Sequence, residues 1–313
     1  MDGAVDSFET GGCDVTRQAG WKPADADLHA GRFLGVCAVH LAALAAPFFF
    51  SWAGLTAFVI LSMATRALGI SLGFHRYLAH GSFKTTRTIR YTLAFLGTLA
   101  AQAGPVNWVA MHRLHHARTD RPDDPHSPRD SVLWAHLGWT FFDRPGQDHA
   151  TLLNYARDIV SDPVLAFMER HMTWICVAVM AALFGLGTAM GGWRLGVSCF
   201  LWGGVLRTAY VWHATFIVNS ALHRFGYRNH PTRDSSTNSA LVNLLIPGDG
   251  WHNNHHAFPR AAGFGHRPSE VDPLFFMLRI LEKVGLTWDV VPPPRTFMKH
   301  SSTSGMRRTK PGR

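Results

Sequence analysis

Histidine is concentrated in three short segments of this 313-residue chain, which contains 19 histidines in all. The segments read FHRYLAH at 74–80, MHRLHH at 111–116 and WHNNHH at 251–256. In the last two, histidines at positions i, i+3 and i+4 of a helix would share one face. Neutral imidazole suits zinc, copper, iron and nickel, so the spacing predicts a metal site. The candidate ligands are His75, His80, His112, His115, His116, His252, His255 and His256.

Two further pairs belong to this pattern. His75 and His80 are five residues apart, about 140° around an α-helix, so we expect them to bracket a site if the helix unwinds at His80. Asn219 and His223 are four residues apart and would share a face at the end of another helix. With His223 included, the histidines exceed what one ion can use. We therefore expect two ions, each with four or five nitrogen ligands.

Other kinds of metal protein fit the pattern less well. A zinc protease of the HExxH type is excluded because that motif does not occur in the sequence. A metal permease would carry ionisable groups near the middle of its membrane spans. The obvious candidates there are His40, Arg66, Arg207 and His213, whereas the dense clusters lie at predicted helix ends. This favours a fixed site, and a metal-transporting membrane protein is the alternative from a different class.

The elements that must position these histidines are predicted to be membrane helices. Hydrophobic residues make up 47% of the chain and charged residues 16%, below the roughly 25% of soluble domains. Two apolar stretches are each long enough for two helices of about 20 residues. We predict an all-α membrane protein with two helical hairpins, in preference to buried core helices of a soluble protein. The predicted transmembrane helices span about 33–50, 53–73, 174–191 and 195–222.

The distribution of positive charge predicts the orientation. The connections within the hairpins carry one basic residue at most, Arg194, whereas the N-terminus, 75–172 and the segment after 223 are rich in arginine and lysine. By the positive-inside rule, both termini and the histidine clusters are cytoplasmic. The first 32 residues contain no apolar run, so we expect no cleavable signal peptide. An anionic lipid surface explains the net charge of +9 better than nucleic acid does, because no nucleic-acid motif accompanies it.

The chain is predicted to have three parts. Residues 1–32 form a cytoplasmic N-terminal segment, 33–290 a membrane domain whose cytoplasmic helical cap holds the di-metal site, and 291–313 a basic disordered tail. Within the domain, 88–104 predicts an interfacial or buried helix. The cysteines show no paired spacing and are expected to be apolar fillers in a reducing compartment. They are Cys13, Cys37, Cys176 and Cys199.

The order HxxxxH, HxxHH, HxxHH, interleaved with two hairpins, resembles the membrane-bound fatty acid desaturases. More closely it is similar to the stearoyl-CoA (Δ9) desaturase branch and its bacterial relatives. The resemblance covers roughly residues 50–290 and rests on several specific motifs. They are GISLGFHRYLAH, NWVAMHRLHH, DDPHSP, HLGW, NSALHRFGYR and GDGWHNNHHAFP.

The resemblance implies a di-iron centre held by nine histidines, with Asn219 reaching a metal through water. One departure concerns the last motif, where relatives often read GEGWH and this chain has Asp249. The shorter carboxylate is expected to alter the geometry around the ligands without loss of metal. The implied ligands are His75, His80, His112, His115, His116, His223, His252, His255 and His256.

The implied reaction uses O2 and two external electrons to introduce a cis double bond, of the Δ9 type, into a long acyl chain. The acyl carrier could be coenzyme A, a glycerolipid or a carrier protein. The chain has no HPGG haem motif, dinucleotide fingerprint or cysteine cluster, so the electrons must come from a separate ferredoxin or cytochrome b5-type donor. Alternatives are a desaturase or acetylenase of carrier-protein-bound chains and a membrane fatty acid hydroxylase.

Further residues have expected roles in binding substrate or supporting the ligands. By resemblance, Trp108 and Thr215 line the bend of an acyl tunnel, and Met63 and Ala67 lie toward its closed end. Carboxylates near the ligands are candidates to hydrogen-bond imidazoles and fix their tautomers. These candidates are Asp120, Asp123, Asp124 and Asp249, with Trp251 beside them.

Lone histidines are expected to be structural or solvated. This applies to His29, His40, His136 and His300. His126 and His213 lie nearer the clusters and are expected to pack beside the ligands.

Overall fold

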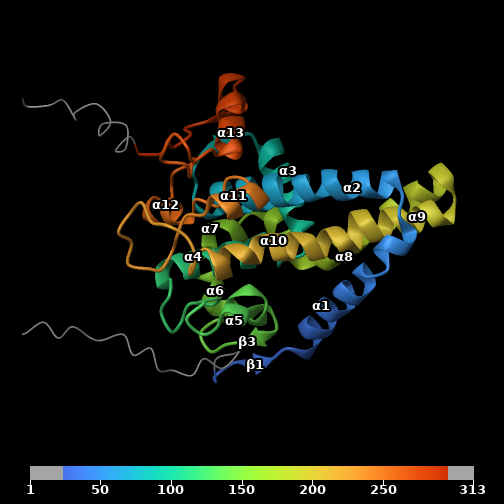
Figure 1. Cartoon of the computed structure of the whole chain (residues 1–313), viewed down its shortest axis with the longest axis horizontal. Coiled ribbons are helices and arrows are strands. Elements are labelled where there is room, and N and C mark those ends of the chain that lie inside the picture. Colours follow the sequence, from blue (N-terminus) through green and yellow to red (C-terminus); the bar gives the residue numbers. More distant parts are fainter. Residues whose placement is uncertain (1–23, 295–313) are drawn as a thin grey trace, which may run out of the picture.

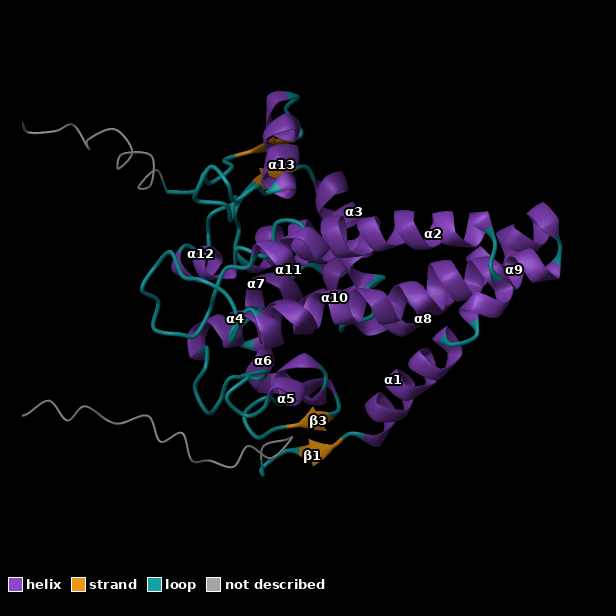
Figure 2. Cartoon of the chain, in the orientation of Figure 1, coloured by secondary structure: helices purple, strands orange, loops and turns teal. Residues whose placement is uncertain are grey.

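A computed structural model describes residues 24–294 of the chain. Most of the predicted N-terminal segment and basic tail, together with Cys13 and His300, lies outside this range. In the described part, long helices run side by side toward one end, and short helices and loops gather at the other (Figure 1). Figure 2 shows how little strand the described part contains. This mostly helical architecture confirms the predicted fold class at that level.

The long helices are built from joined segments. Helix α1 (Ala30–Ala43) leads through the 3₁₀ turn η1 (Ala46–Phe49) to α2 (Trp52–Ser62), which continues directly as a π-helix, η2 (Met63–Ala79). After the cap, α8 (Pro163–Gly191) returns along the bundle. The chain then turns at Gly192, whose φ of 82° suits glycine. The segments α9 (Trp193–Cys199), π-helix η4 (Phe200–Leu206) and α10 (Arg207–Ala221) follow without a break.

The helices of the structure differ in their bounds from the predicted spans, and the four-span layout stays a prediction. Within residues 24–294, two helices are long and apolar enough to cross a membrane, Trp52–Ala79 and Pro163–Gly191. The predicted span 33–50 is the shorter helix α1, followed by η1, and 53–73 extends to Ala79. Helix α8 begins eleven residues before the predicted 174, because Asp162 caps it through the backbone N–H groups of Val164 and Leu165.

The region predicted at 88–104 is helix α3 (Arg87–Thr98), which packs against the π-helix η2. The approach is close: a Cβ on Gly69 would lie 2.4 Å from the backbone nitrogen of Gly97. Glycine at 69 therefore permits the contact. This packing holds the C-terminal half of η2, where the first histidines lie.

The cap is made of short helices and two small strand pairs. Strand β1 (Asp27–Leu28) pairs antiparallel with β3 (Phe142–Asp143), and β2 (Lys84–Thr85) pairs with β4 (Thr287–Trp288). The helical elements of the cap are α4 (Pro105–Arg118), α5 (Val132–His136), η3 (Gly138–Thr140), α6 (His149–Leu153), α7 (Arg157–Val160), α11 (Ala240–Leu245), α12 (His252–Ala257) and α13 (Pro273–Lys283).

The largest apolar cluster lies beneath the cap and joins η2, α4 and α8. Phe74, Val109 and Leu165 are fully buried in it. Near the end of the described chain, the Val291 N–H donates to the Ser82 carbonyl, and the Ala262 N–H donates to the Val291 carbonyl. These contacts fix η2, α4 and the segment that leads out of α12 against one another. The histidine clusters lie on these elements.

Candidate metal centre

The π-helix explains the spacing of the first two histidines. The backbone N–H of His80 donates to the carbonyl of His75 at 3.2 Å, which is the i→i+5 bond of a π-helix. Residues five apart are therefore about one turn apart, and the two rings lie with centroids 5.1 Å apart. The predicted separation of 140° assumed an α-helix and is wrong. The helix widens where it was expected to unwind.

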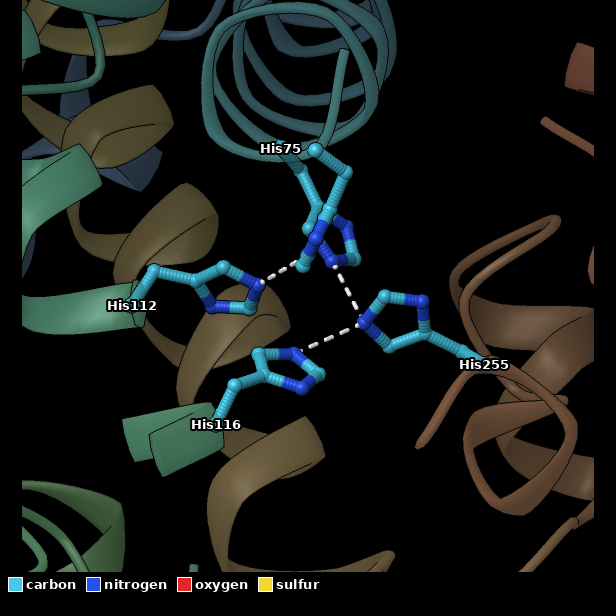
Figure 3. Close-up of side chains that lie close together, drawn as sticks. His75, His112, His116 and His255 are labelled. Atoms are coloured by element: carbon cyan, nitrogen blue, oxygen red, sulfur yellow. Dashed lines mark hydrogen bonds between the residues drawn. The ribbon is translucent and has the colours of Figure 1, made fainter. Parts of the chain in front are cut away.

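Five histidines form a first group, which we call the five-histidine group. His75 and His80 come from η2, His112 and His116 from α4, and His255 from α12, and one ligand atom from each lies within 4.8 Å of every other. Figure 3 shows the rings of His75, His112, His116 and His255 turned toward one another from these separate elements. The His255 Nε2 atom lies 2.9 Å from His75 Nε2 and 3.0 Å from His116 Nε2.

Four histidines form a second group, the four-histidine group. His115 comes from α4, His223 from the turn after α10, and His252 and His256 from α12, again with ligand atoms within 4.8 Å of one another. The Nε2 atoms of His223 and His252 are 3.0 Å apart. All four side chains are buried or nearly so.

Helical geometry decides how each HxxHH motif divides between the groups. Relative to position i, position i+4 lies about 40° around the helix in one direction and i+3 about 60° in the other. In α4, His112 and His116 join the five-histidine group and His115 the four-histidine group. In α12 the assignment is reversed, because His252 and His256 join the four-histidine group and His255 the other. Each HxxHH motif thus contributes histidines to both groups.

The protonation state of these histidines suits metal binding. Burial lowers the pKa of His80 to about 3. Burial is also the main cause that holds the pKa of other cluster histidines well below the ordinary 6.5; these are His112, His115, His116, His252 and His255. The rings are therefore neutral at pH 7, which is the form that ligates metals.

The hydrogen-bonding pattern also fits a metal. A ring nitrogen carries one proton or one lone pair, yet His255 Nε2 faces two other Nε2 atoms at hydrogen-bond distance. His256 Nε2 is buried without a hydrogen-bond partner, although its Nδ1 donates to Asp234 at 2.9 Å. Converging lone pairs with no proton to share are satisfied by a cation. The donor set therefore fits two metal ions, one in each group.

Carboxylates contact the outer nitrogens of the four-histidine group. His115 Nδ1 lies 2.9 Å from Asp124, and His223 Nδ1 lies 3.4 Å from Asp120. Burial by itself would raise the pKa of Asp120, but hydrogen bonding and charge from His223 hold it below its usual value. Asp120 and Asp124 therefore lie beside candidate ligands, and their role in fixing the tautomers stays a prediction.

The other predicted neighbours are placed differently. Asp249 accepts from Arg66 at 2.6 Å and from Ser71 at 2.7 Å, while its distance to His75 Nδ1 is 4.0 Å. Asp123 lies on the surface in an ion pair with Arg118, so its predicted contact with an imidazole is wrong.

Trp251 is buried at the start of α12, and its indole N–H donates to the Val271 carbonyl at 2.9 Å. This bond anchors the beginning of the helix that carries three of the histidines.

Asp234 was missed by the sequence interpretation. It accepts from His256 Nδ1, and His256 holds its pKa well below the usual value although burial would raise it. In the sequence it stands in RDSSTN, which reads as a turn, and its side chain does accept from Ser236. The turn by itself accounts for an aspartate here, so the local sequence gives no sign of the contact with His256.

The lone histidines form contacts of their own. His213 Nε2 lies 3.0 Å from His40 Nε2, and His213 Nδ1 lies 2.9 Å from His136 Nε2, which links α1, α10 and α5. His29 caps α1 by accepting from the Arg32 N–H. The His126 ring packs 4.3 Å from that of His115, as expected of a residue beside the ligands.

An apolar cavity of about 510 Å³ borders the five-histidine group. Trp108, Thr215, Asn219 and His112 all line it, and the Trp108 ring stacks on His112 with centroids 5.1 Å apart. The structure brings neither Met63 nor Ala67 to this cavity.

Met63 is 58% exposed on the outer face of η2, and Ala67 is buried in a separate apolar cluster. Their predicted place is therefore not part of this cavity. Its walls come from α1, α4, η3, α8 and α10 and from the loops before and after α4. The remaining lining residues are Arg32, Gly35, Val36, Val39, Ala101, Gln102, Ala103, Met111, His126, Trp139, Thr140, Met172, Thr173, Trp212 and Phe216.

The helical fold and the paired histidine groups, which could each hold a metal ion, suit a membrane-associated metalloprotein, and comparison with known proteins places the chain in a family. The sequence profile of the fatty acid desaturase family matches residues 23–268, and the chain belongs to that family. The resemblance inferred from the motifs is thereby confirmed. The protein is a membrane-associated oxidoreductase that introduces a double bond into an acyl chain.

Named relatives cover most of the chain. The sn-1 stearoyl-lipid 9-desaturase of Anabaena variabilis is 41% identical over 82% of this chain and 91% of its own length. The icosanoyl-CoA 5-desaturase of Limnanthes douglasii is 34% identical over 87% of this chain and 74% of its own. The hex-5-enoyl-[acyl-carrier protein] acetylenase of Moorena producens is 35% identical, with 74% of each chain covered.

Proposed function

We propose that this chain is an oxygen-dependent Δ9-type acyl desaturase that forms a cis double bond with two iron ions. The observation that carries the proposal is the pair of neutral histidine groups beside an apolar cavity. His75, His80, His112, His116 and His255 would hold one ion. His115, His223, His252 and His256 would hold the other. Asn219, on the cavity wall, would reach a metal through water.

The chain's own residues provide position and shelter for the reaction. Two iron ions, when bound, would supply the oxidising power from O2 that removes two hydrogens from a methylene group. The cavity would hold an extended acyl chain against His112, with the Trp108 ring fixing its path. Burial of the histidine groups excludes water from the reacting carbons. The carboxylates Asp120, Asp124 and Asp234 would keep the imidazoles of the second group in one tautomer.

The membrane arrangement supports the same function. We propose four spans, with α1–η1 and α2–η2 as one hairpin and α8 and α9–α10 as the other, and with the termini and histidine groups on the cytoplasmic side. Both hairpins turn at the end of the molecule opposite the histidine-bearing helices α4 and α12 (Figure 1). The connection at Gly192 carries only Arg194 nearby, whereas the cap is rich in arginine, as the positive-inside rule requires.

We propose that two electrons per turnover come from another protein, a ferredoxin or a cytochrome b5-type donor. A polar pocket at the surface is lined by His256 of the four-histidine group together with Arg233 and Phe258. A donor bound at this pocket would have a short path for electrons to His256.

A second candidate is an acetylenase or desaturase of carrier-protein-bound chains, which one relative at 35% identity favours by its name. Membership of the desaturase family sets aside the metal transporter. A hydroxylase would be recognised by oxygen retained in the product.

Expression in a bacterial host without an aerobic desaturase tests the proposal. The fatty acids of cells carrying the parent chain, His255→Ala and His149→Ala would be compared with and without oxygen, and double bonds mapped by mass spectrometry. His149 is exposed on α6 and serves as the matched control. We expect oxygen-dependent cis-Δ9 products from the parent and from His149→Ala, and none from His255→Ala. Products with bonds elsewhere, or hydroxylated products, would contradict the proposal.

A further inference from the structure

The cavity beside the histidines is closed on most sides but has an exposed rim. Gly35 on α1 and Thr173 on α8 both line it, and both are solvent-exposed in the isolated chain. Helix α1 leaves the bundle at an angle (Figure 1), and its main packing partners are η4 and α10 rather than α8. The two helices thus form facing walls of one cavity without sealing the space between them. The opening lies between α1 and α8.

Gly35 is unusual among the residues of this opening. It stands within the helix α1, where glycine is less favourable than alanine. No neighbour requires it, because a Cβ at this position would meet nothing within 4 Å. Close helix packing, which explains Gly69, therefore does not explain Gly35. Its effect is to leave the rim of the cavity without a side chain.

The opening lies at the depth where each helix changes from polar to apolar. On α8, Glu169, Arg170 and His171 immediately precede Met172, and no charged residue follows until Arg194. On α1, Arg32 is the last charged residue before a long uncharged stretch. Such boundaries mark the interface between headgroups and hydrocarbon, where the ester groups of membrane lipids lie.

The outer surfaces beside the opening are apolar and exposed in the isolated chain. Leu34 is 64% exposed and Trp174 71% exposed, and they flank the rim on α1 and α8. Only 11% of the most apolar window of α8 is buried within the chain. A path from the rim into the cavity therefore begins in the bilayer. It ends at His112, so one acyl chain could occupy the whole path.

We propose that the space between α1 and α8 is a lateral portal, through which the acyl chain of an intact membrane glycerolipid slides from the bilayer to the histidine groups. The proposal rests on the function proposed above and names its substrate class. Arg32 lines the same cavity at the rim, where it binds Asp143 and the Thr140 carbonyl. Its guanidinium lies where the phosphate or ester oxygens of the lipid would be held.

Photolabelling of the full chain in lipid vesicles tests the portal without requiring turnover. One set of vesicles contains phosphatidylglycerol with a diazirine on its acyl chain, and a second set receives the same diazirine acyl group as a coenzyme A thioester. The variants are Gly35→Trp, which fills the rim, and Leu34→Trp, which adds the same bulk one residue away on the lipid-facing side. Gly35→Ala is the conservative control, because its Cβ meets no neighbour.

We expect the lipid probe to label Val36, Val39 and Met172 in the parent, in Gly35→Ala and in Leu34→Trp, and at least tenfold less in Gly35→Trp. Bound metal should be equal in all four, which shows that the tryptophan has not disturbed the histidine groups. Labelling of these residues by the thioester but not by the lipid would overturn the portal, as would equal lipid labelling in Gly35→Trp. Lipid labelling as expected, with no unsaturated product from the reduced parent, would leave the portal standing and refute the proposed function.

Discussion

The two histidine groups lie side by side but are held in different ways. In the four-histidine group, three imidazoles have a carboxylate at Nδ1, with His115 on Asp124, His223 on Asp120 and His256 on Asp234. In the five-histidine group, the carboxylate of Asp249 lies 4.0 Å from His75 Nδ1 and is bonded instead to Arg66 and Ser71.

This difference means that the imidazole rings of the two groups are held in position by different contacts. The five-histidine group is positioned by backbone: the π-turn of η2 and the helices α4 and α12 place the rings. The four-histidine group also lies on α4 and α12, but three carboxylates in addition hold its outer nitrogens, and their negative charge makes the imidazoles better ligands. Two ions of the same element would therefore experience unequal ligand fields. Changes to one group should have effects that the corresponding changes in the other do not.

Removal of a ligand gives the largest expected effect. His252→Ala leaves three nitrogens in its group, whereas His116→Ala leaves four in the other. Because loss of an outer partner alone costs about 10–100-fold in metal affinity, we expect loss of a ligand from the smaller group to cost more than about 100-fold. His252→Ala should bind one ion fewer per chain, and His116→Ala should keep both. Metal analysis of purified protein measures this, and equal metal loss in both variants would contradict the comparison.

Asp249→Asn should affect folding more than metal binding. Asp249 is buried with Arg66, and removal of one partner of a buried ion pair costs about 3–5 kcal/mol. The control is Asp289→Asn, whose pair with Lys84 is exposed and should contribute less than about 1 kcal/mol. Unfolding in detergent, followed for metal-loaded and metal-free protein, gives both values. A purely metal-dependent loss of stability in Asp249→Asn would show that its main partner is His75.

Asp124→Asn should affect metal binding more than folding. The amide lacks the negative charge that strengthens the hydrogen bond from His115 Nδ1. The metal affinity of the four-histidine group should therefore fall about 10–100-fold. Asp123→Asn, one residue away on the surface, should leave the affinity unchanged. Competition with a chelator measures both. If the two variants release metal alike, the carboxylates do not support the group.

The smallest effect concerns a histidine pair outside both groups. His266 Nδ1 lies 2.8 Å from His230 Nε2, and burial lowers the pKa of His266 to about 4, with His230 adding to the effect. The folded state thus binds fewer protons than the unfolded state between about pH 6.5 and 4, so stability falls as pH falls through this window. The negative charge of Glu270, whose carboxylate accepts from the backbone N–H of His266, partly offsets the lowering of the His266 pKa.

His266→Phe should lose less stability than the parent between pH 7 and pH 5. The difference in melting temperature between the two proteins is the measured quantity. A constant difference across this range would show that His266 does not titrate there.

The sequence predicted most of the chemistry and less of the structure that supports it. All nine histidines expected to be ligands lie in one of the two groups, because HxxHH spacing is local and a helix converts it directly into position. Asp234 escaped prediction because it reaches His256 through the tertiary fold, 22 residues away in sequence. Asp123 was wrongly included because proximity to Asp124 in sequence says nothing about which side chain turns inward.

The ends and types of the helices were also difficult to predict from the sequence. The polar residues Glu169 and Arg170 hid the first turns of α8 from a hydropathy argument, although Asp162-Pro163 is a capping signal that could have located its start. The π-helix η2 gives no comparable signal, since neither its residue types nor a capping pattern distinguishes it from an α-helix.

The number of residues between His75 and His80 matches the length of a π-helical turn. Four intervening residues return a side chain to the same side only when each turn takes an extra residue, as the 3.2 Å bond from His80 to His75 shows. Three intervening residues would do the same in an ordinary α-helix. A chain shortened by one residue between these histidines could thus recover the site by tightening a single turn, whereas a deletion within α4 has no looser turn to absorb it. Tolerance to insertion and deletion should therefore differ sharply between the two helices.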